Sequence, residues 1–366
     1  MRLSKTNQIV LTTGLALFAM FFGAGNMVFP LAIGADAGQH LLAAWLAFLL
    51  AGVGIPFLGL FAISLYDGDY WDFFGILGKY LSFAVVTFII FIIGPLFAAP
   101  RTEDITFSTL QPFLPTALTN PFFSIFYFVV IFFLSYKHQH VINIIGRVIS
   151  PLKLTAFIIL IAASLMTMNV LLPTPKSLSY VVSNSLSTGY GTMDLLGAFF
   201  YCAVAYKSIV HKCAEIGITD RRVITITILK ACVIGAILIG LIYTGFMFSA
   251  AMHARDLQNT PTPAMIVEIS HVVLGKYGAF FVCICVTLAC IATATALAVV
   301  SARFFFQTLF RHAIPRVICL ILVLMFMYTM SILGFDFIMK VATPILNVLY
   351  PCLIVLCVVN IYRKLK

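Results

Sequence analysis

Charged residues are scarce in this chain. They make up 9% of its 366 residues, and only 12 residues are acidic. Soluble domains usually carry about 25% charged residues, so this composition excludes a protein with a water-covered surface. Hydrophobic residues make up 62% of the sequence, and a lipid bilayer is therefore the expected solvent for most of the fold. We expect one integral membrane domain that takes up residues 1–366.

The sequence also lacks the common signatures of catalytic and metal centres. Its nine cysteines form no CxxC pair, and its seven histidines are dispersed without an HExxH motif. No pair of aspartates lies inside an apolar segment. These absences argue against a membrane-embedded enzyme and against a resident cofactor. A channel is a further alternative, but no repeated filter motif is visible.

Long apolar segments separated by short polar loops occur along the whole chain. A helix needs about 20 mostly apolar residues to cross the hydrocarbon core of a bilayer. The candidate spans are 8–35, 40–64, 78–99, 119–136, 141–169, 191–210, 223–250, 272–301, 313–332 and 336–361. We therefore expect an all-α polytopic membrane protein with about 10 transmembrane helices.

The distribution of Lys and Arg predicts the orientation of these spans. If the N-terminus is cytoplasmic, only five of the 22 basic residues fall on the outer side, namely Arg101, Lys176, Arg255, Lys276 and Lys340. This excess on the inner side predicts that both termini are cytoplasmic. It also accounts for the net charge of +10. Because the basic residues are split among short loops, they form no continuous stripe for nucleic acid.

The first span is longer than a straight helix needs to be. Residues 8–35 would form a helix of about 42 Å, while the hydrocarbon core is about 30 Å thick. Gly23, Gly25 and Asn26 weaken a helix here, and Pro30 cannot donate a backbone hydrogen bond to residue 26. These features favour a break in mid-bilayer. A close helix–helix contact through Gly23-x-Gly25 is the alternative.

Unwound backbone at membrane depth must be buried in protein or line a cavity. In such a break the N–H groups around Gly23, Ala24 and Gly25 would be free, at the start of the outer half-helix. Amides at a helix N-terminus suit a carboxylate, and free carbonyls suit a cation or an ammonium group. The break is therefore a candidate binding site.

The same residues carry a resemblance to a known family. The segment GLALFAMFFGAGN at 14–26, followed by Phe29-Pro30, resembles the first-helix signature of the branched-chain amino acid:cation symporter (LIVCS) family. Three further segments resemble that family in the expected order: GPLFAAPRT at 94–102, Thr192-Met193-Asp194 at the start of the sixth span, and 343–351 in the tenth. The resemblance runs from about residue 7 to residue 360.

The resemblance implies a fold and a function. The fold is an inverted repeat of five plus five helices, about 7–170 and 188–362, with helices 1 and 6 discontinuous. The function is import of leucine, isoleucine and valine with Na⁺ or H⁺, by alternating access across a bacterial cytoplasmic (inner) membrane. Another neutral amino acid such as methionine is the main alternative, because apolar pockets separate neighbours by only about 1–3 kcal/mol per methylene. Family members commonly carry two more C-terminal helices, and this chain ends without them.

By the resemblance, the substrate site joins the first and sixth spans. A second break is expected near Tyr201 to Ala203, where backbone carbonyls would hold the substrate ammonium. Phe200 and Tyr206 would flank the substrate side chain, although they could equally be core of the bundle. The full set of predicted substrate-binding residues is Gly23, Ala24, Gly25, Asn26, Phe200, Tyr201, Cys202, Ala203 and Tyr206.

The resemblance also places a candidate Na⁺ site beside the first break. Its ligands would be carbonyls of Ala19, Phe22 and Ala289 and the hydroxyl of Thr293. Ala292 stands where related transporters have another hydroxyl, and losing one of about five oxygens should weaken a sodium site. Thr293 could instead bond only its own helix backbone.

Lys153 opens the long apolar run of the fifth span. An ionisable residue inside the membrane is a functional candidate by default. One hypothesis is that its ammonium group occupies or competes for the cation site and couples transport to protons. The alternative is that the side chain snorkels to the cytoplasmic interface, about two turns away.

The remaining charges have simpler interpretations. Asp194 and Asp336 are expected to cap the sixth and tenth spans. Arg101, Glu103 and Asp104 are expected in an outer loop, with a gate role as the alternative.

Overall fold

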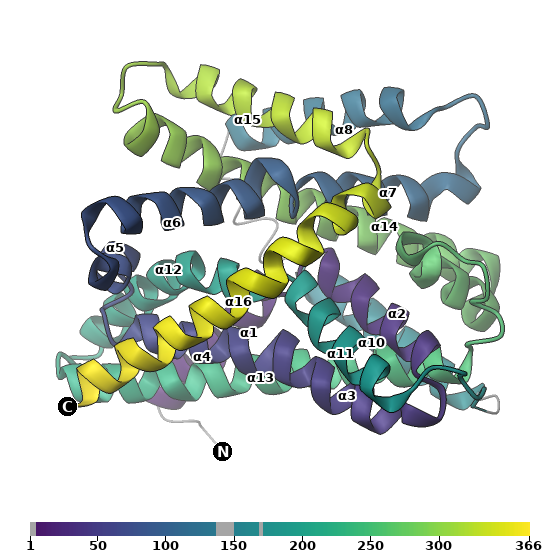
Figure 1. Ribbon diagram of the computed structural model, residues 1–366, viewed down its shortest axis with the longest axis horizontal. Coiled ribbons are helices and arrows are strands. Elements are labelled where there is room, and N and C mark those ends of the chain that lie inside the picture. Colours follow the sequence, from purple (N-terminus) through teal and green to yellow (C-terminus); the bar gives the residue numbers. More distant parts are fainter. Residues whose placement is uncertain (1–4, 137–149, 168–170) are drawn as a thin grey trace.

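The computed structural model describes residues 5–136, 150–167 and 171–366, and most of these residues are helical (Figure 1). The α-helices are α1 (Lys5–Phe21), α2 (Gly25–Ala37), α3 (Leu41–Leu49), α4 (Ile55–Ser64), α5 (Tyr70–Phe74), α6 (Lys79–Phe91), α7 (Pro100–Leu110), α8 (Asn120–Tyr136), α10 (Ser150–Met166), α11 (Leu178–Gly191), α12 (Asp194–Glu215), α13 (Arg221–Met252), α14 (Met265–Phe304), α15 (Arg316–Ser331) and α16 (Phe335–Leu365). The π-helical turns are η2 (Leu50–Gly54), η4 (Ile92–Leu96) and η8 (Phe305–Leu309), and the 3₁₀ turns are η1 (Gly38–His40), η3 (Gly75–Leu77), η5 (Gln111–Phe113) and η7 (Thr262–Ala264). No strand occurs in the described ranges, and the predicted all-α class is confirmed.

The apolar helices coincide with the predicted spans. In the part of the chain that the structure describes, six helical segments are long and apolar enough to cross a membrane, and four shorter apolar helices accompany them. Residues 141–149 and 168–169 of the predicted fifth span lie outside the described residues. Large side chains such as Phe122, Phe126 and Phe133 of α8 are exposed, which fits a surface that is covered by lipid.

Polar residues set several helix boundaries. Ser177, Asp220 and Asp69 each accept a hydrogen bond from a backbone N–H in the first turn of the helix that follows, and so act as N-caps. Gly334, which has a φ of 85°, comes directly before α16. Residues with side chains rarely adopt this backbone conformation, so glycine permits the tight turn between α15 and α16.

The helices form two groups (Figure 1). One group, here called the bundle group, consists of α1–α4 and α11–α13, which are spans 1, 2, 6 and 7. The other, here called the scaffold group, consists of α6–α8, α14 and α15, which are spans 3, 4, 8 and 9. The remaining long helices connect the groups: α10 packs on α13 and α14, and α16 runs diagonally across the molecule from α4 to α7.

The packing partners repeat when each span is exchanged for the span five places later. Span 1 (α1, α2) packs on span 7 (α13), as span 6 (α11, α12) packs on span 2 (α3, α4). Span 4 (α8) packs on span 8 (α14), as span 9 (α15) packs on span 3 (α7). Span 5 (α10) likewise packs on span 8 (α14), as span 10 (α16) packs on span 3 (α7). The fold is therefore the predicted repeat of five plus five helices.

Helices 1 and 6 are both discontinuous, as predicted. Span 1 is interrupted between Phe21 and Gly25, where the sequence placed the break. Span 6 is interrupted between Gly191 and Asp194, at Thr192 and Met193. The predicted break at 201–203 is wrong, because Asp194–Glu215 is one continuous helix.

Span 3 is longer than predicted. The sequence placed its end at residue 99. In the structure, the π-helical turn η4 contains Pro95, and α7 begins at Pro100, where a missing N–H costs nothing. The helical segment therefore runs from Lys79 to Phe113 and brings charged residues into the protein interior.

Candidate functional site

The break in span 1 leaves backbone N–H groups at the start of α2. The first four N–H groups of a helix have no partner within the helix, and Ala24, at the N-cap position, makes no side-chain capping bond. Gly23 N–H donates to the carbonyl of Phe21 at 2.7 Å, which turns the chain sharply between the two half-helices. The positive end of the α2 dipole therefore faces the break, and an anionic group would be stabilised there.

The break in span 6 has a different construction. The helix α11 ends at Gly191, and Met193 adopts a left-handed conformation with a φ of 61° before α12 begins at Asp194. The last carbonyls of α11 are not left free, because the guanidinium of Arg101 donates to the oxygens of Gly191 and Thr192, the latter at 2.9 Å.

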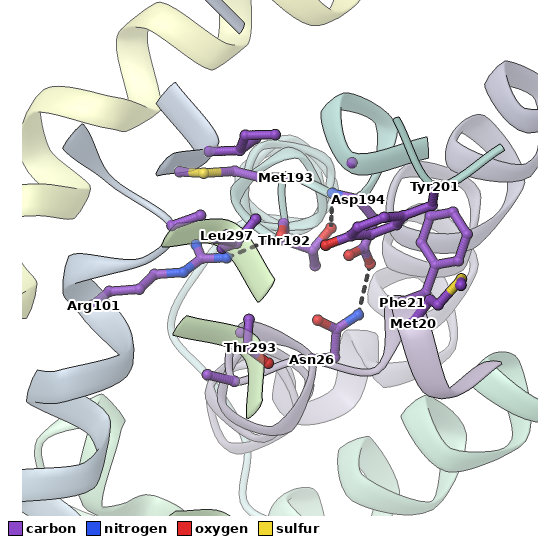
Figure 2. Close-up of a pocket in the computed structure, with 16 residues that line it drawn as sticks. Met20, Phe21, Asn26, Arg101, Thr192, Met193, Asp194, Tyr201, Thr293 and Leu297 are labelled. Atoms are coloured by element: carbon purple, nitrogen blue, oxygen red, sulfur yellow. Dashed lines mark hydrogen bonds between the residues drawn. The ribbon is translucent and has the colours of Figure 1, made fainter. Parts of the chain in front are cut away.

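A buried pocket lies where the two breaks meet (Figure 2). It is lined by both groups of helices, which contribute residues 20–21, 23–26, 192–194, 197 and 201 from the bundle group and Ile93, Ala98, Arg101, Thr293 and Leu297 from the scaffold group. The pocket thus combines unwound backbone, two charged side chains and apolar side chains. Such a combination suits a small ligand that is polar at one end and apolar at the other.

Asp194 stands at the centre of a buried hydrogen-bond network. Its Oδ2 accepts hydrogen bonds from Asn26 Nδ2 at 2.6 Å and from the hydroxyl of Tyr243 at 3.1 Å, and Asn26 Nδ2 also contacts that hydroxyl. This network joins spans 1, 6 and 7. Asp194 is thus the first residue of α12 and lines the pocket, whereas the sequence predicted a cap at the start of span 6.

Arg101 was predicted in an outer loop, and this prediction is wrong. The side chain is 3% exposed, and its guanidinium lies 5.2 Å from the centre of the Phe29 ring. Glu103 and Asp104 on the same helix are also buried, so the predicted outer loop is an interior helix. One feature of the sequence could have indicated this burial. PRTEDITFSTL has a run of charges directly after an apolar span, and such charges can be buried only when other helices cover them.

Five of the predicted substrate-binding residues line the pocket: Gly23, Ala24, Gly25, Asn26 and Tyr201. The Tyr201 ring makes an edge contact with Phe21, with ring centres 5.4 Å apart.

The other four predicted residues do not line this pocket, because α12 continues as a regular helix past them. Phe200 packs on Tyr70, and the Cys202 thiol donates to the carbonyl of Leu60 at 3.5 Å. Ala203 lies beside Gly68, and the Tyr206 hydroxyl donates to Asp67 at 2.5 Å. The carbonyls of Tyr201 and Cys202 lie inside the helix and are not released by a break.

The residues of the predicted cation site are adjacent to the pocket. Thr293 lines it, and a Cβ added at Gly23 would lie 3.3 Å from the Thr293 hydroxyl. That hydroxyl donates to the carbonyl of Ala289 at 3.0 Å within its own helix. The Phe22 carbonyl accepts a hydrogen bond from Lys153 Nζ at 2.9 Å, and Ala19 lies one turn earlier in α1.

Lys153 does not snorkel to an interface. Its side chain is 4% exposed, and its ammonium group lies 5.5 Å from the centre of the Phe22 ring. The fifth span therefore delivers a positive charge to the end of α1, at a carbonyl that the sequence had assigned to a cation. The terminal amine of Lys153 thus lies at the break in span 1, because the Phe22 carbonyl that it contacts is part of that break.

The chain resembles known transport proteins over nearly its whole length. The family model described as "Branched-chain amino acid transport protein" matches residues 6–366. The branched-chain amino acid permease BraB of Bacillus subtilis is 29% identical over 362 residues, which cover 96% of this chain and 79% of that protein. The branched-chain amino acid permease BrnQ of Escherichia coli strain K12 is 28% identical, with 97% and 80% covered, and the transport system 2 carrier protein of Pseudomonas aeruginosa is 29% identical, with 97% and 81% covered.

Solved structures share the fold at lower sequence identity. Mhp1 in an inward-facing conformation superposes with a TM-score of 0.67 at 14% identity, covering 95% of this chain and 75% of Mhp1. MhsT in complex with L-phenylalanine superposes with a TM-score of 0.58 at 17% identity, covering 88% of this chain and 78% of MhsT. At these identities the likeness concerns the fold alone.

Proposed function

Because this chain belongs to the branched-chain amino acid transport protein family, we propose that it imports leucine, isoleucine and valine by secondary active symport. The observation that carries the proposal is the pocket at the meeting point of the two broken helices, where the N-terminus of α2 faces an otherwise buried space. A substrate carboxylate would accept hydrogen bonds from the amides at Ala24 and Gly25, and the helix dipole would favour its charge.

The aliphatic side chain of the substrate would lie against the apolar residues of the pocket. Phe21, Ile93 and Leu297 supply this surface from both groups of helices. Apolar contacts of this kind distinguish substrates by about 1–3 kcal/mol per methylene. Leucine, isoleucine and valine would therefore share the site, and methionine is the neighbour that competes for it.

The pocket lies between the bundle group and the scaffold group, so relative motion of the two groups would change its access. Opening on one side while the other stays closed is the geometry of alternating access around a fixed site. We place the chain in a bacterial cytoplasmic membrane, with both termini in the cytoplasm, on the distribution of its basic residues.

We propose H⁺ as the coupling ion and Lys153 as its carrier. The ammonium group donates to the Phe22 carbonyl, which is one of the oxygens that a sodium ion would need. A sodium ion at the same oxygen would stand beside a buried positive charge, and the two would repel each other. Loss of the proton from Lys153 would leave a neutral amine, which is a weaker donor to the Phe22 carbonyl. Proton movement would therefore change the strength of this contact between spans 5 and 1 at the break.

Leucine uptake into proteoliposomes tests both parts of this function. Sodium and proton gradients are imposed separately, and unlabelled valine, methionine, phenylalanine and glutamate serve as competitors. We expect uptake driven by the proton gradient, with competition by valine and less by phenylalanine or glutamate. No uptake of any neutral amino acid would refute the transport proposal, and uptake driven by sodium alone would refute the proton coupling.

A further inference from the structure

Two buried charges of opposite sign line the pocket from different groups of helices. Arg101 lies on α7 of the scaffold group and Asp194 on α12 of the bundle group, with exposed fractions of 3% and 7%. The ion pairs within the described residues are Lys176 with Asp36 and His211 with Glu215, so Arg101 and Asp194 do not pair directly. Buried charges are normally paired, and this separation calls for a ligand that carries both counter-charges.

The wall formed by Arg101 is positive. Its two terminal nitrogens already donate to the carbonyls of Gly191 and Thr192, and its Nε is buried without a partner among the described residues. The guanidinium also lies against the start of α2, since a Cβ added at Gly25 would be 2.7 Å from Nη2. A guanidinium beside the positive end of a helix dipole makes a local excess of donors, which an anionic group between them would satisfy.

The opposite wall, formed by Asp194, is negative. The hydrogen bonds that Asn26 and Tyr243 donate to the carboxylate both end on Oδ2. A carboxylate offers about four acceptor sites on its two oxygens, and an ammonium group brings three donors. Figure 2 shows Asp194 and the side chain of Arg101 at separate places on the rim of the open space, with Asn26 directed toward Asp194.

We propose that Arg101 and Asp194 bind the two charged groups of the substrate. Arg101 and the amides at the start of α2 bind the carboxylate, and Asp194 binds the ammonium group, so the site recognises the whole zwitterion of an α-amino acid. The inference rests on the proposed function, since it assigns residues within the same pocket. In this assignment Asp194 binds the ammonium group. The carbonyls near Tyr201 and Cys202, which the sequence predicted for this role, are held inside α12.

The consequence is a selectivity that apolar contacts alone cannot give. The 2-oxo acid of leucine, 4-methyl-2-oxopentanoate, has the same branched side chain and the carboxylate but no ammonium group. The amine 3-methylbutylamine has the side chain and the ammonium group but no carboxylate. A site with one buried counter-charge for each group rejects both compounds, because each leaves one charge without its partner.

Binding to the purified full-length protein, measured by calorimetry in detergent, tests the inference. The ligands are leucine, the 2-oxo acid and the amine. The wild-type protein should bind leucine at least about tenfold more tightly than either analogue. Failure of the wild-type protein to bind any neutral amino acid would refute the proposed function, whereas equal affinities for leucine and both analogues would overturn this inference alone.

Two variants, each of which removes one buried charge, test which charged group of the substrate each residue binds. In Asp194→Asn, the affinity for leucine should fall at least about tenfold, and the preference for leucine over the 2-oxo acid should shrink by a similar factor. In Arg101→Gln, the preference for leucine over the amine should shrink instead. The exposed residues Asp336 and Arg255 provide matched controls, Asp336→Asn and Arg255→Gln, which should keep wild-type affinities and preferences.

A purely structural role for these residues predicts other outcomes. Asp194→Glu and Arg101→Lys keep the charges and should keep the rejection of the 2-oxo acid and of the amine, respectively, even where leucine binds more weakly. Neutral variants that keep both preferences within about twofold would overturn the inference. So would loss of all binding in both the neutral and the charge-keeping variants, when thermal melting shows them to be folded.

Discussion

Replacing Lys153 with methionine removes a buried charge and keeps a side chain of similar length. Lys153 Nζ donates to the Phe22 carbonyl at 2.9 Å, and the side chain is 4% exposed. Methionine is apolar and flexible enough to fill the same space, so the packing between α10 and α14 should persist. We expect the variant to fold, to bind leucine and to exchange it, but to lose the link to the proton gradient.

The size of the effect follows from one titrating group in each chain. If Lys153 carries one proton with each leucine, a pH difference of one unit supplies about 1.4 kcal/mol, which is a tenfold accumulation. Two units with the lower pH outside would give about a hundredfold accumulation at zero membrane potential. In Lys153→Met the accumulation ratio should fall to about one under the same gradient.

Two assays on the same proteoliposomes separate coupling from binding. Net uptake of labelled leucine is measured under a pH difference with the membrane potential clamped by potassium and valinomycin, and exchange is measured with unlabelled leucine inside and no gradient. Lys207→Met is the matched control. It makes the same substitution at an exposed lysine and should leave both net uptake and exchange unchanged. Gradient-driven accumulation that persists in Lys153→Met, or wild-type uptake that depends on sodium at constant pH, would refute the assignment.

Three further variants test the surroundings of the site. Tyr243→Phe removes a hydroxyl that donates to Asp194 and should weaken leucine binding by about 1–2 kcal/mol in calorimetry; an unchanged dissociation constant would contradict the network's role in the site. Thr293→Val keeps the shape of a side chain whose hydroxyl bonds the Ala289 carbonyl of its own helix, so the KM for leucine and its sodium dependence should stay within about twofold, whereas a sodium-dependent rise in KM would point to a sodium ligand. Gly34→Ala would place a Cβ 2.8 Å from the carbonyl carbon of Met247, so the α2–α13 contact must shift; a thermal melt should show a loss of stability of about 1–3 kcal/mol, and an unchanged melting temperature would contradict this close approach.

The break in span 1 could be predicted from the sequence because its causes are local. Gly23, Gly25, Asn26 and Pro30 each weaken a helix, and they occur within eight residues of an apolar segment that is too long to be straight. The break in span 6 has no such cluster. Its first half, α11, is rich in serine and threonine, so its hydropathy resembles that of a loop, although Ser185 bonds the Val181 carbonyl within its own helix.

The buried charges could not be assigned from the sequence, because their environment is created by distant helices. Arg101 is stabilised by carbonyls about 90 residues away, at Gly191 and Thr192. Lys153 is held by Phe22, which lies 131 residues earlier. From local sequence, a charge beside a proline at the end of an apolar run is typical of a loop, and a lysine at the start of a span is typical of snorkelling. Only the folded repeat shows which charges are enclosed.

The two breaks share an electrostatic arrangement that follows from the repeat. At each break one half-helix ends and exposes its last carbonyls, which are the negative end of its dipole. A buried cation meets those carbonyls in both cases: Lys153 at Phe22, just past α1, and Arg101 at Gly191 and Thr192, the end of α11. The other half-helices, α2 and α12, begin at the pocket with their positive ends, and only α12 carries an acidic residue there, Asp194. The start of α2 is therefore the place in the pocket where positive potential lacks a fixed counter-charge, which is the physical reason to place a substrate carboxylate at that helix.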